Sequence, residues 1–115
     1  EFLVAMVGFN NNDVDVLKKT IWLEARGEPY DGQVAVAHVI KNRAETNRGY
    51  WGGNTISGVC LYPQQFECWN NRQPQNTHPQ GEGWNELEGI ARGVLGGTIR
   101  DPTNGESFSF PSLIF

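Results

Sequence analysis

The sequence is poor in the residues that most often carry metal, redox or nucleic-acid chemistry. Its 115 residues include only two cysteines and two histidines, too few at metal-like spacing for a zinc site, so we expect no bound metal. Nine Lys and Arg against thirteen Asp and Glu give a net charge of −4, and the basic residues are scattered along the chain. Nucleic acid and anionic membrane surfaces are therefore not expected as partners. No stretch approaches the roughly 20 apolar residues of a membrane span.

Glycine and proline, by contrast, are plentiful, with 14 and 6 residues, which indicates a large share of loop. The length predicts one domain over residues 1–115 with a modest core, and we expect a monomer. An apolar segment, Phe2–Phe9, opens the chain without a basic leader before it. It is either the remnant of a signal or anchor or a first core-packing element. We favour packing, so no clear signal peptide is predicted.

Apolar residues at helical spacing predict a mainly α fold that begins with two helices. The first helix starts at Asn12 or Asp13, whose side chains suit a helix cap, and it ends before Gly27. The second helix runs from about Gly32 to Ala44, with Asp31 as its cap. The short connection predicts that the two helices form a hairpin.

Further along the chain the pattern predicts less regular structure and one more helix. A short helical turn is expected over Thr55–Val59, with Asn54 as its cap. The apolar stripe from Trp84 to Leu95 predicts a helix that ends at the glycines 96–97. The tail Ser107–Phe115 begins with apolar and polar residues in alternation, which predicts a small β element at a sheet edge.

Two glutamates close to the end of the first predicted helix are the leading candidates for chemistry. Glu24 follows Ile21 by three residues, so it lies at the edge of the apolar face and in the last helical turn. Partial desolvation and the negative pole of the helix both favour the protonated carboxyl, as a general acid requires. Glu28 follows in the turn and is a possible second carboxylate. The alternative is that Glu24 is a surface glutamate paired with Lys18 or Arg26.

Three blocks of the sequence resemble one enzyme family. These are the stretch containing WLEARGEPYDGQVAVAHVIKNR (Leu17 to Arg43), GVCLYPQQFECW (Gly58–Trp69) and DPTNG (Asp101–Gly105). They are similar to the motifs of the SleB/CwlJ-type cell-wall hydrolases, a family of spore-cortex lytic enzymes and related peptidoglycan-degrading domains of phages and bacteria. The resemblance implies a lysozyme-like, lytic transglycosylase-like fold with Glu24 as the catalytic acid. It also implies that Gln65 and Phe66 lie by the cleft and bind substrate.

The tail departs from the family pattern. After Gly105 the chain reads ESFSFPSLIF, whereas relatives continue for some tens of residues, so the C-terminus looks shortened. This departure motivates a different class of function, in which the chain is a non-catalytic peptidoglycan-binding relative with a degenerate cleft.

Other side chains are candidates for contacts with sugar. Arg43 falls on the apolar side of the second helix and there requires an anionic partner, for which Glu24 and Glu28 are candidates. It then orients a carboxylate or a sugar; alternatively it lies along the surface with its stem packed. Tyr50 and Trp51 lie in a glycine-rich loop and either stack on sugar rings or anchor that loop.

The two cysteines, Cys60 and Cys68, flank a turn and form either a local disulfide or two reduced, buried thiols. A nucleophilic pair of either cysteine with His78 would make a cysteine peptidase, a third class of function for which the sequence shows no activation. His38 falls on the polar side of the second helix and is expected at the surface.

By resemblance, the expected reaction is cleavage of peptidoglycan glycan strands between N-acetylmuramic acid and N-acetylglucosamine. Glu24 would act alone in a lytic transglycosylase, or with Glu28 directing water in a muramidase. No cofactor is implied, and the expected partner is the glycan strand. The setting is either a phage lysin acting on the bacterial wall or a secreted, cell-envelope enzyme of the spore cortex.

Overall fold

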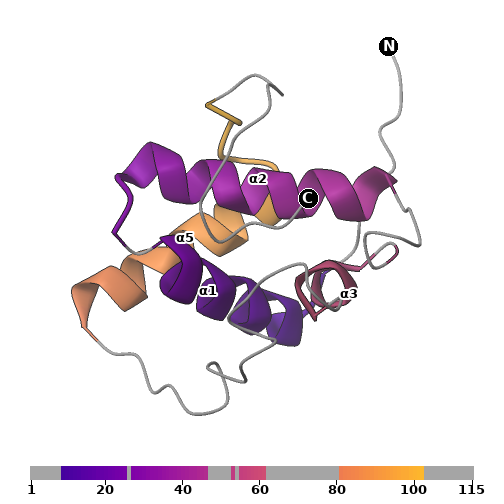
Figure 1. The fold of residues 1–115 in the computed structure, drawn as a ribbon, viewed down its shortest axis with the longest axis horizontal. Helices are drawn as coiled ribbons and strands as arrows, with labels where there is room; N and C mark the ends of the chain where they lie inside the picture. The colour runs from indigo at the N-terminus through magenta and orange to yellow at the C-terminus, as the bar shows by residue number, and fades with distance from the viewer. Residues whose placement is uncertain (1–8, 26, 47–52, 54, 62–80, 103–115) are drawn as a thin grey trace.

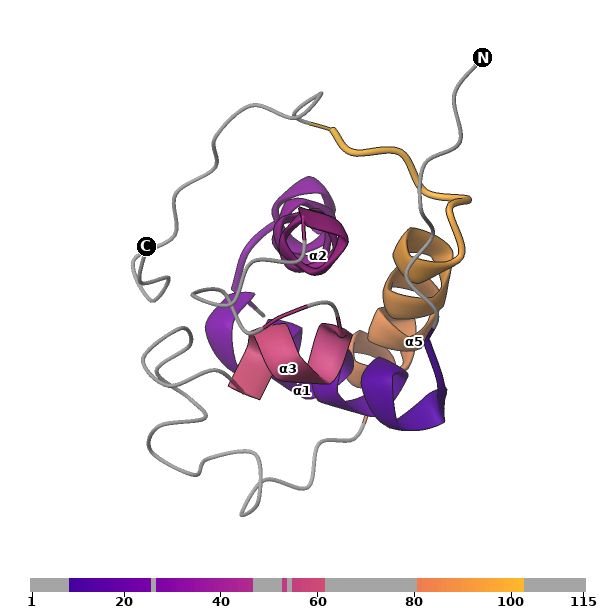
Figure 2. The same cartoon turned by 90° about the vertical axis from the view of Figure 1, so that its right-hand side faces the viewer.

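The computed structural model of the chain describes residues 9–25, 27–46, 53, 55–61 and 81–102. These residues form α1 (Asn11–Ala25), α2 (Tyr30–Thr46), α3 (Ile56–Leu61) and α5 (Glu82–Leu95). Helices α1 and α2 contact each other, and both contact α3 and α5, so that α2 lies across the other three (Figures 1 and 2). The mainly α prediction is confirmed.

No strand occurs in the part of the chain that the structure describes. The tail for which an edge strand was predicted, Ser107–Phe115, lies outside the described residues. None of the described helices is long and apolar enough to cross a membrane.

One apolar core fills the space between the four helices. Its fully buried side chains come from every helix. The largest of them are Leu17, Ile21, Val34, Val36, Ile40, Ile56, Val59, Leu87, Ile90 and Val94. At the edge of this core Trp22 and Trp84 meet edge to face, with ring centroids 5.8 Å apart, and join α1 to α5.

A reciprocal pair of side chains fixes the start of α1. The Asn10 side chain accepts a hydrogen bond from the Asp13 amide at 2.8 Å, and the Asp13 carboxylate accepts one from the Asn10 amide at 3.1 Å. This is the arrangement of a capping box. The cap is Asn10, and Asp13 lies inside the first turn of the helix. The prediction of Asn12 or Asp13 as the cap was therefore wrong by two or three residues.

Helix α2 begins two residues earlier than predicted and extends two residues further. It starts at Tyr30 because the Pro29 carbonyl accepts the first helical hydrogen bond, from the Gln33 amide at 3.1 Å. Asp31 is therefore inside the first turn and is not the cap. At the other end the Thr46 hydroxyl donates to the Asn42 carbonyl at 2.7 Å within the last turn.

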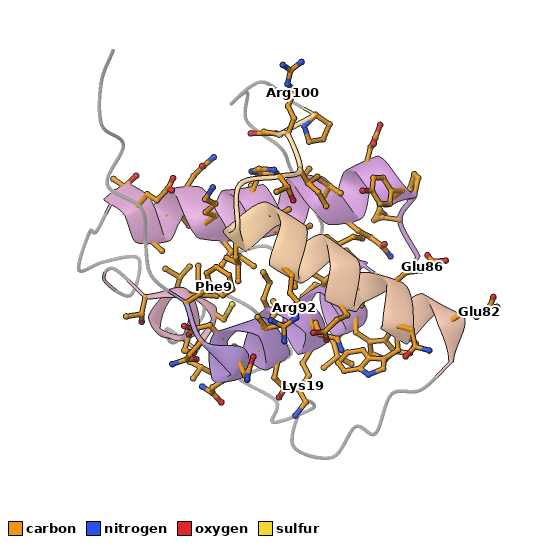
Figure 3. All side chains as sticks on the ribbon, turned by 180° about the vertical axis from the view of Figure 1, so that it is seen from behind. Phe9, Lys19, Glu82, Glu86, Arg92 and Arg100 are labelled. Atoms are coloured by element: carbon orange, nitrogen blue, oxygen red, sulfur yellow. The ribbon has the colours of Figure 1, made fainter. Side chains whose placement is uncertain are left out.

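The ends of α3 and α5 follow their local chemistry. Thr55 caps α3 by accepting a hydrogen bond from the Gly58 amide at 2.9 Å, in the role that the sequence gave to Asn54, a residue outside the described part. Helix α5 ends at the predicted glycines: the Gly96 amide bonds the Arg92 carbonyl, and Gly97 takes a positive φ of 84°. The outer side of α5 is charged, with Glu82 and Glu86 directed away from the core (Figure 3).

Candidate active site

Glu24 lies in the last turn of α1, one residue before the helix ends at Ala25. Its neighbours Ile21 and Ala25 are buried in the core, and Glu24 itself is half-buried. The predicted position at the edge of the apolar face and at the negative pole of the helix is thus confirmed.

Glu28 lies in the exposed turn that joins α1 to α2. Its amide donates to the Ala25 carbonyl at 3.0 Å, which closes the last turn of α1. Its side chain rests against the first turn of α2 at Gly32, where an added Cβ would lie 3.0 Å from the Glu28 Cβ. The glycine at this position permits that close approach. Both predicted carboxylates therefore border the same turn.

Two further side chains reach this turn and were not predicted as site residues. Gln33 donates from Nε2 to the Ala25 carbonyl at 3.3 Å, so a side chain of α2 contacts the end of α1. Tyr30 opens α2 and is 55% exposed, an unusual exposure for an aromatic ring. The sequence signal was available: a tyrosine directly after Pro29, with an amide one helical turn later.

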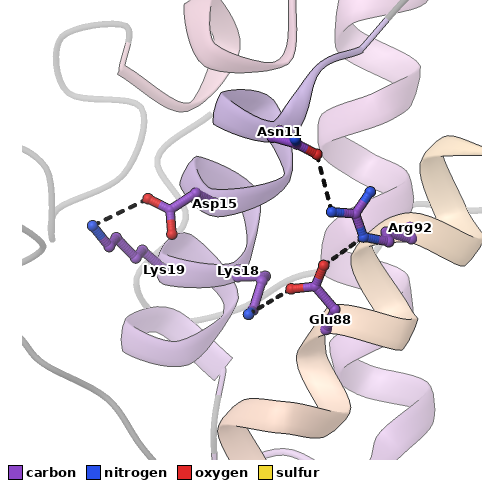
Figure 4. A network of polar contacts seen from close by, with 6 residues as sticks. All are labelled: Asn11, Asp15, Lys18, Lys19, Glu88 and Arg92. Atoms are coloured by element: carbon purple, nitrogen blue, oxygen red, sulfur yellow. Dashed lines mark hydrogen bonds and ion pairs between the residues drawn. The ribbon is translucent and has the colours of Figure 1, made fainter.

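Lys18 is not a partner of Glu24. Its ammonium binds the Glu88 carboxylate at 2.7 Å and lies 4.1 Å from the centroid of the Trp84 ring (Figure 4). Arg92 also binds Glu88, and it donates to the Asn11 side chain at 3.0 Å. Hydrogen bonds from Lys18 and Arg92 hold the pKa of Glu88 below its usual value. The predicted alternative pairing of Glu24 with Lys18 is therefore wrong, and Arg26, the other partner considered for Glu24, lies outside the described residues.

Arg43 is buried near the C-terminal end of α2, and its burial lowers the pKa of the guanidinium. The alternative of an arginine lying along the surface is wrong. The helix from Tyr30 to Arg43 is about 20 Å long at roughly 1.5 Å per residue, which is further than the two side chains span together. The predicted pairing of Arg43 with Glu28 is therefore not formed, because Glu28 precedes the other end of α2.

His38 was expected at the surface and is instead buried, with 8% of its area exposed. Its Nε2 lies 2.8 Å from the carbonyl oxygen of Ile99. The prediction failed because the segment after α5 folds back over α2 and covers the side that the helix alone would leave polar.

Cys60 is a free thiol with no exposed surface, one residue before the end of α3. Burial raises the pKa of Cys60 to about 12; a hydrogen bond from Thr20 opposes the rise, and the charge of Asp13 adds to it. Of the two alternatives for the cysteines, the structure shows the buried thiol at Cys60 and not a disulfide to Cys68. A thiol in this state is neither ionised at neutral pH nor accessible to a peptide.

Several predicted substrate-contact residues lie outside the described part of the chain. They are Tyr50, Trp51, Gln65 and Phe66, and Cys68 is outside it as well. Among the described residues, no group of three or more His, Cys, Asp or Glu side chains is arranged to hold a metal ion.

Comparison with known proteins finds one matching family and several relatives that share one name. The sequence model described as Cell Wall Hydrolase matches residues 27–111. Proteins named spore cortex-lytic enzyme from Bacillus subtilis, Bacillus cereus and Oceanobacillus iheyensis are each 46% identical over 59 residues, which is 51% of this chain. The match covers 18%, 22% and 20% of those proteins, so the chain spans about a fifth of the length of the curated relatives. No solved structure matches significantly.

The position of the family match bears on the two carboxylates. It begins at Gly27, so it includes Glu28 and starts three residues after Glu24. The two glutamates must therefore be distinguished by their environments and by experiment.

Proposed function

This chain belongs to the Cell Wall Hydrolase family, and from that premise we propose that it cleaves peptidoglycan glycan strands between N-acetylmuramic acid and N-acetylglucosamine. The observation that carries the proposal is the situation of Glu24, a half-buried carboxylate at the C-terminal pole of α1 beside an open turn. The names of the spore cortex-lytic relatives support the choice of substrate.

In the first step Glu24 donates its proton to the glycosidic oxygen. The bond between that oxygen and the anomeric carbon of N-acetylmuramic acid breaks, and the ring passes through an oxocarbenium-like state. Glu24 lies at the C-terminal end of α1, beside the exposed turn where the strand is proposed to bind.

In the second step Glu24, now a carboxylate, removes the proton of the 6-hydroxyl of the same muramic acid. That oxygen attacks the anomeric carbon and gives a 1,6-anhydro product, as in a lytic transglycosylase. This route needs one carboxylate, so it does not require Glu28, which lies in the exposed turn with its side chain against Gly32. The muramidase alternative gives Glu28 that task.

Several aromatic and polar side chains are proposed to hold the glycan strand. Tyr30 offers an exposed ring beside the turn on which a sugar face can stack. The sequence adds Tyr50, Trp51, Gln65 and Phe66 as contacts, and Arg43 as a buried support of the substrate-binding region. We propose a lysozyme-like arrangement of the whole chain as one monomeric domain. The chemistry as written uses only protein side chains and the substrate.

The natural substrate is proposed to be one of two kinds of peptidoglycan. The relatives' names favour the peptidoglycan of the spore cortex as the natural substrate, and a phage lysin that acts on the vegetative wall is the second candidate. Clearing of purified cortex by this chain, compared with clearing of vegetative walls, separates these two settings.

The products of digestion test the proposed reaction. The 115-residue chain is incubated with purified peptidoglycan, and the soluble fragments are identified by mass spectrometry. We expect 1,6-anhydro-muramyl ends, which are one water lighter than reducing ends. Reducing muramic acid ends would replace the transglycosylase route with the muramidase route. New amino groups would indicate a peptidase, and binding to walls without any release of fragments would support a non-catalytic binding module.

A further inference from the structure

The end of α1 is held by an unusual combination of contacts. The carbonyl of Ala25 accepts two hydrogen bonds, one from the Glu28 amide at 3.0 Å and one from Nε2 of Gln33 at 3.3 Å. The last carbonyls of a helix have no partner inside the helix, so each needs a donor from elsewhere. Here one donor is local and the other comes from the next helix.

Gln33 holds the turn between the helices from both sides. Its backbone amide donates to Pro29 at 3.1 Å, which fixes the first turn of α2, while its side chain fixes the last turn of α1. The side chain is partly buried, so water competes weakly for this bond. One residue thereby sets the position of the α1 end relative to the start of α2.

Glu24 is the residue next to Ala25, and its backbone moves with that carbonyl. Helix ends fray easily where their carbonyls are poorly satisfied. A reacting carboxyl must be placed to within a fraction of an ångström, and a displacement of about 1 Å costs on the order of 100-fold in rate. Whatever fixes the Ala25 carbonyl therefore also fixes the point from which the Glu24 side chain extends.

We propose that Gln33 is a positioning residue for Glu24: its side-chain amide, by holding the Ala25 carbonyl, sets the orientation of the carboxyl toward the glycosidic oxygen. The inference rests on the proposed function of Glu24 and adds to it a specific residue on α2. Gln33 itself does not touch the reacting atoms. Its loss should lower kcat and leave the binding of the strand, and so KM, largely unchanged.

The test uses three variants of Gln33 with soluble glycan strands as the substrate. Gln33→Met keeps the length of the side chain and removes the donor; Gln33→Glu keeps its shape and replaces the donor with a carboxylate oxygen; Gln33→Lys retains a donor. We expect kcat to fall roughly 10- to 100-fold in the Met and Glu variants with KM within about twofold, and the Lys variant to recover most of the loss. Thermal unfolding of each variant is measured in parallel.

Arg92→Met is the matched control, because Arg92 pairs with Glu88 of its own helix and joins α5 to α1 through Asn11, at the opposite end of α1 from Ala25. It should lower the unfolding midpoint and leave kcat per folded molecule unchanged. If Gln33→Met loses kcat only in proportion to its loss of folded protein, or if Gln33→Lys recovers nothing, Gln33 is merely structural and the proposal is wrong.

A Glu24→Gln variant separates this proposal from the one on which it rests. If Glu24→Gln is inactive and Gln33→Met keeps full kcat, the positioning proposal fails and the proposed function stands. If Glu24→Gln retains wild-type activity, the assignment of Glu24 fails, and any effect of Gln33 then requires a different explanation.

Discussion

Helix α1 carries a carboxylate at each end, Asp13 in its first turn and Glu24 in its last, and the two occupy opposite environments. Asp13 accepts hydrogen bonds from the Asn10 amide and from both the amide and the hydroxyl of Ser57. It also lies at the positive pole of the helix, where a negative charge is stabilised. Glu24 lies at the negative pole, half-buried beside an exposed turn.

The contrast separates a carboxylate whose hydrogen bonds join two elements of the fold from one that borders an exposed turn. Asp13 joins the start of α1 to α3, and its oxygen atoms are directed at donors of the protein. The dipole of α1 opposes the charge of Glu24, so this interaction does not stabilise the fold at that position. Independent measurements of rate and of stability distinguish the two ends of α1.

The largest effect is expected from replacing the two glutamates of the turn one at a time. Glu24→Gln keeps the shape of the side chain and removes the proton donor, so the rate of strand cleavage should fall by more than about 100-fold with little change in stability. Glu28→Gln should change the rate by less than roughly threefold under the single-carboxylate route. Both rates are measured as release of sugar ends from purified walls.

The reverse result is informative, because the family match begins between the two residues. Loss of activity in Glu28→Gln with a loss below tenfold in Glu24→Gln would transfer the role of acid to Glu28. Loss in both variants would favour the muramidase route with two carboxylates.

Asp13→Ala should have the opposite pattern. It removes the acceptor of one capping bond and of two bonds from Ser57, and it leaves those donors close to buried structure. We expect a loss of about 2 kcal/mol in the free energy of unfolding, measured by urea denaturation. The rate per folded molecule at low temperature should stay unchanged. Ser57→Ala is the milder control, and a rate loss larger than the loss of folded protein would contradict the structural role of Asp13.

We expect the stability of the protein to fall at alkaline pH because of Cys60, whose thiol is affected by the charge of Asp13 in the first turn of α1. Because burial raises the pKa of Cys60 from 9.0 to about 12, the folded state keeps its proton where the unfolded thiol has lost it. The contribution of Cys60 to stability is therefore complete below pH 9 and is lost as the pH rises from 9 toward 12. The slope should approach about 1 kcal/mol per pH unit relative to Cys60→Ala.

The same variant tests the cysteine-peptidase class. Cys60→Ala should retain wall-degrading activity, because the thiol is fully buried and takes no part in the proposed chemistry. Native protein should also react slowly with iodoacetamide at this residue. Equal slopes in wild type and Cys60→Ala between pH 9 and 11 would show that the thiol ionises as easily in the folded state.

The sequence predicted those features that depend on local periodicity. Leu17 and Ile21 are buried and Glu24 lies at the edge of the buried face because one helical register determines all three. The end of α5 was also predictable, since two consecutive glycines favour the geometry of a helix terminus. The exact start of α1 was not, because Asn10 and Asp13 are equally good caps until their mutual hydrogen bonds are seen.

Side chains whose partners lie far away in the sequence could not be predicted. His38 contacts a carbonyl 61 residues later, and Lys18 binds a carboxylate 70 residues later. Their burial depends on how α5 and the segment after it pack, and no local pattern contains that information. The contact of Gln33 with Ala25 depends on the shape of the intervening turn, so it could not be predicted from the sequence either.

The smallest effect is expected at the interface of α1 and α5, where Lys18 binds Glu88 (Figure 4). Hydrogen bonds from Lys18 and Arg92 lower the pKa of Glu88, so its contribution to stability is present above its unfolded value near 4.5 and is lost as the pH falls through the lower folded value. The Glu88 side chain is 40% exposed, and solvent screening limits the contribution to about 1 kcal/mol or less. A double-mutant cycle of Lys18→Met and Glu88→Gln should give a coupling of roughly 0.5 kcal/mol at pH 6. The coupling should weaken as the pH falls below the unfolded value near 4.5 and the Glu88 carboxylate takes up a proton. A coupling that stays constant as the pH is lowered would contradict an ion pair between Lys18 and Glu88.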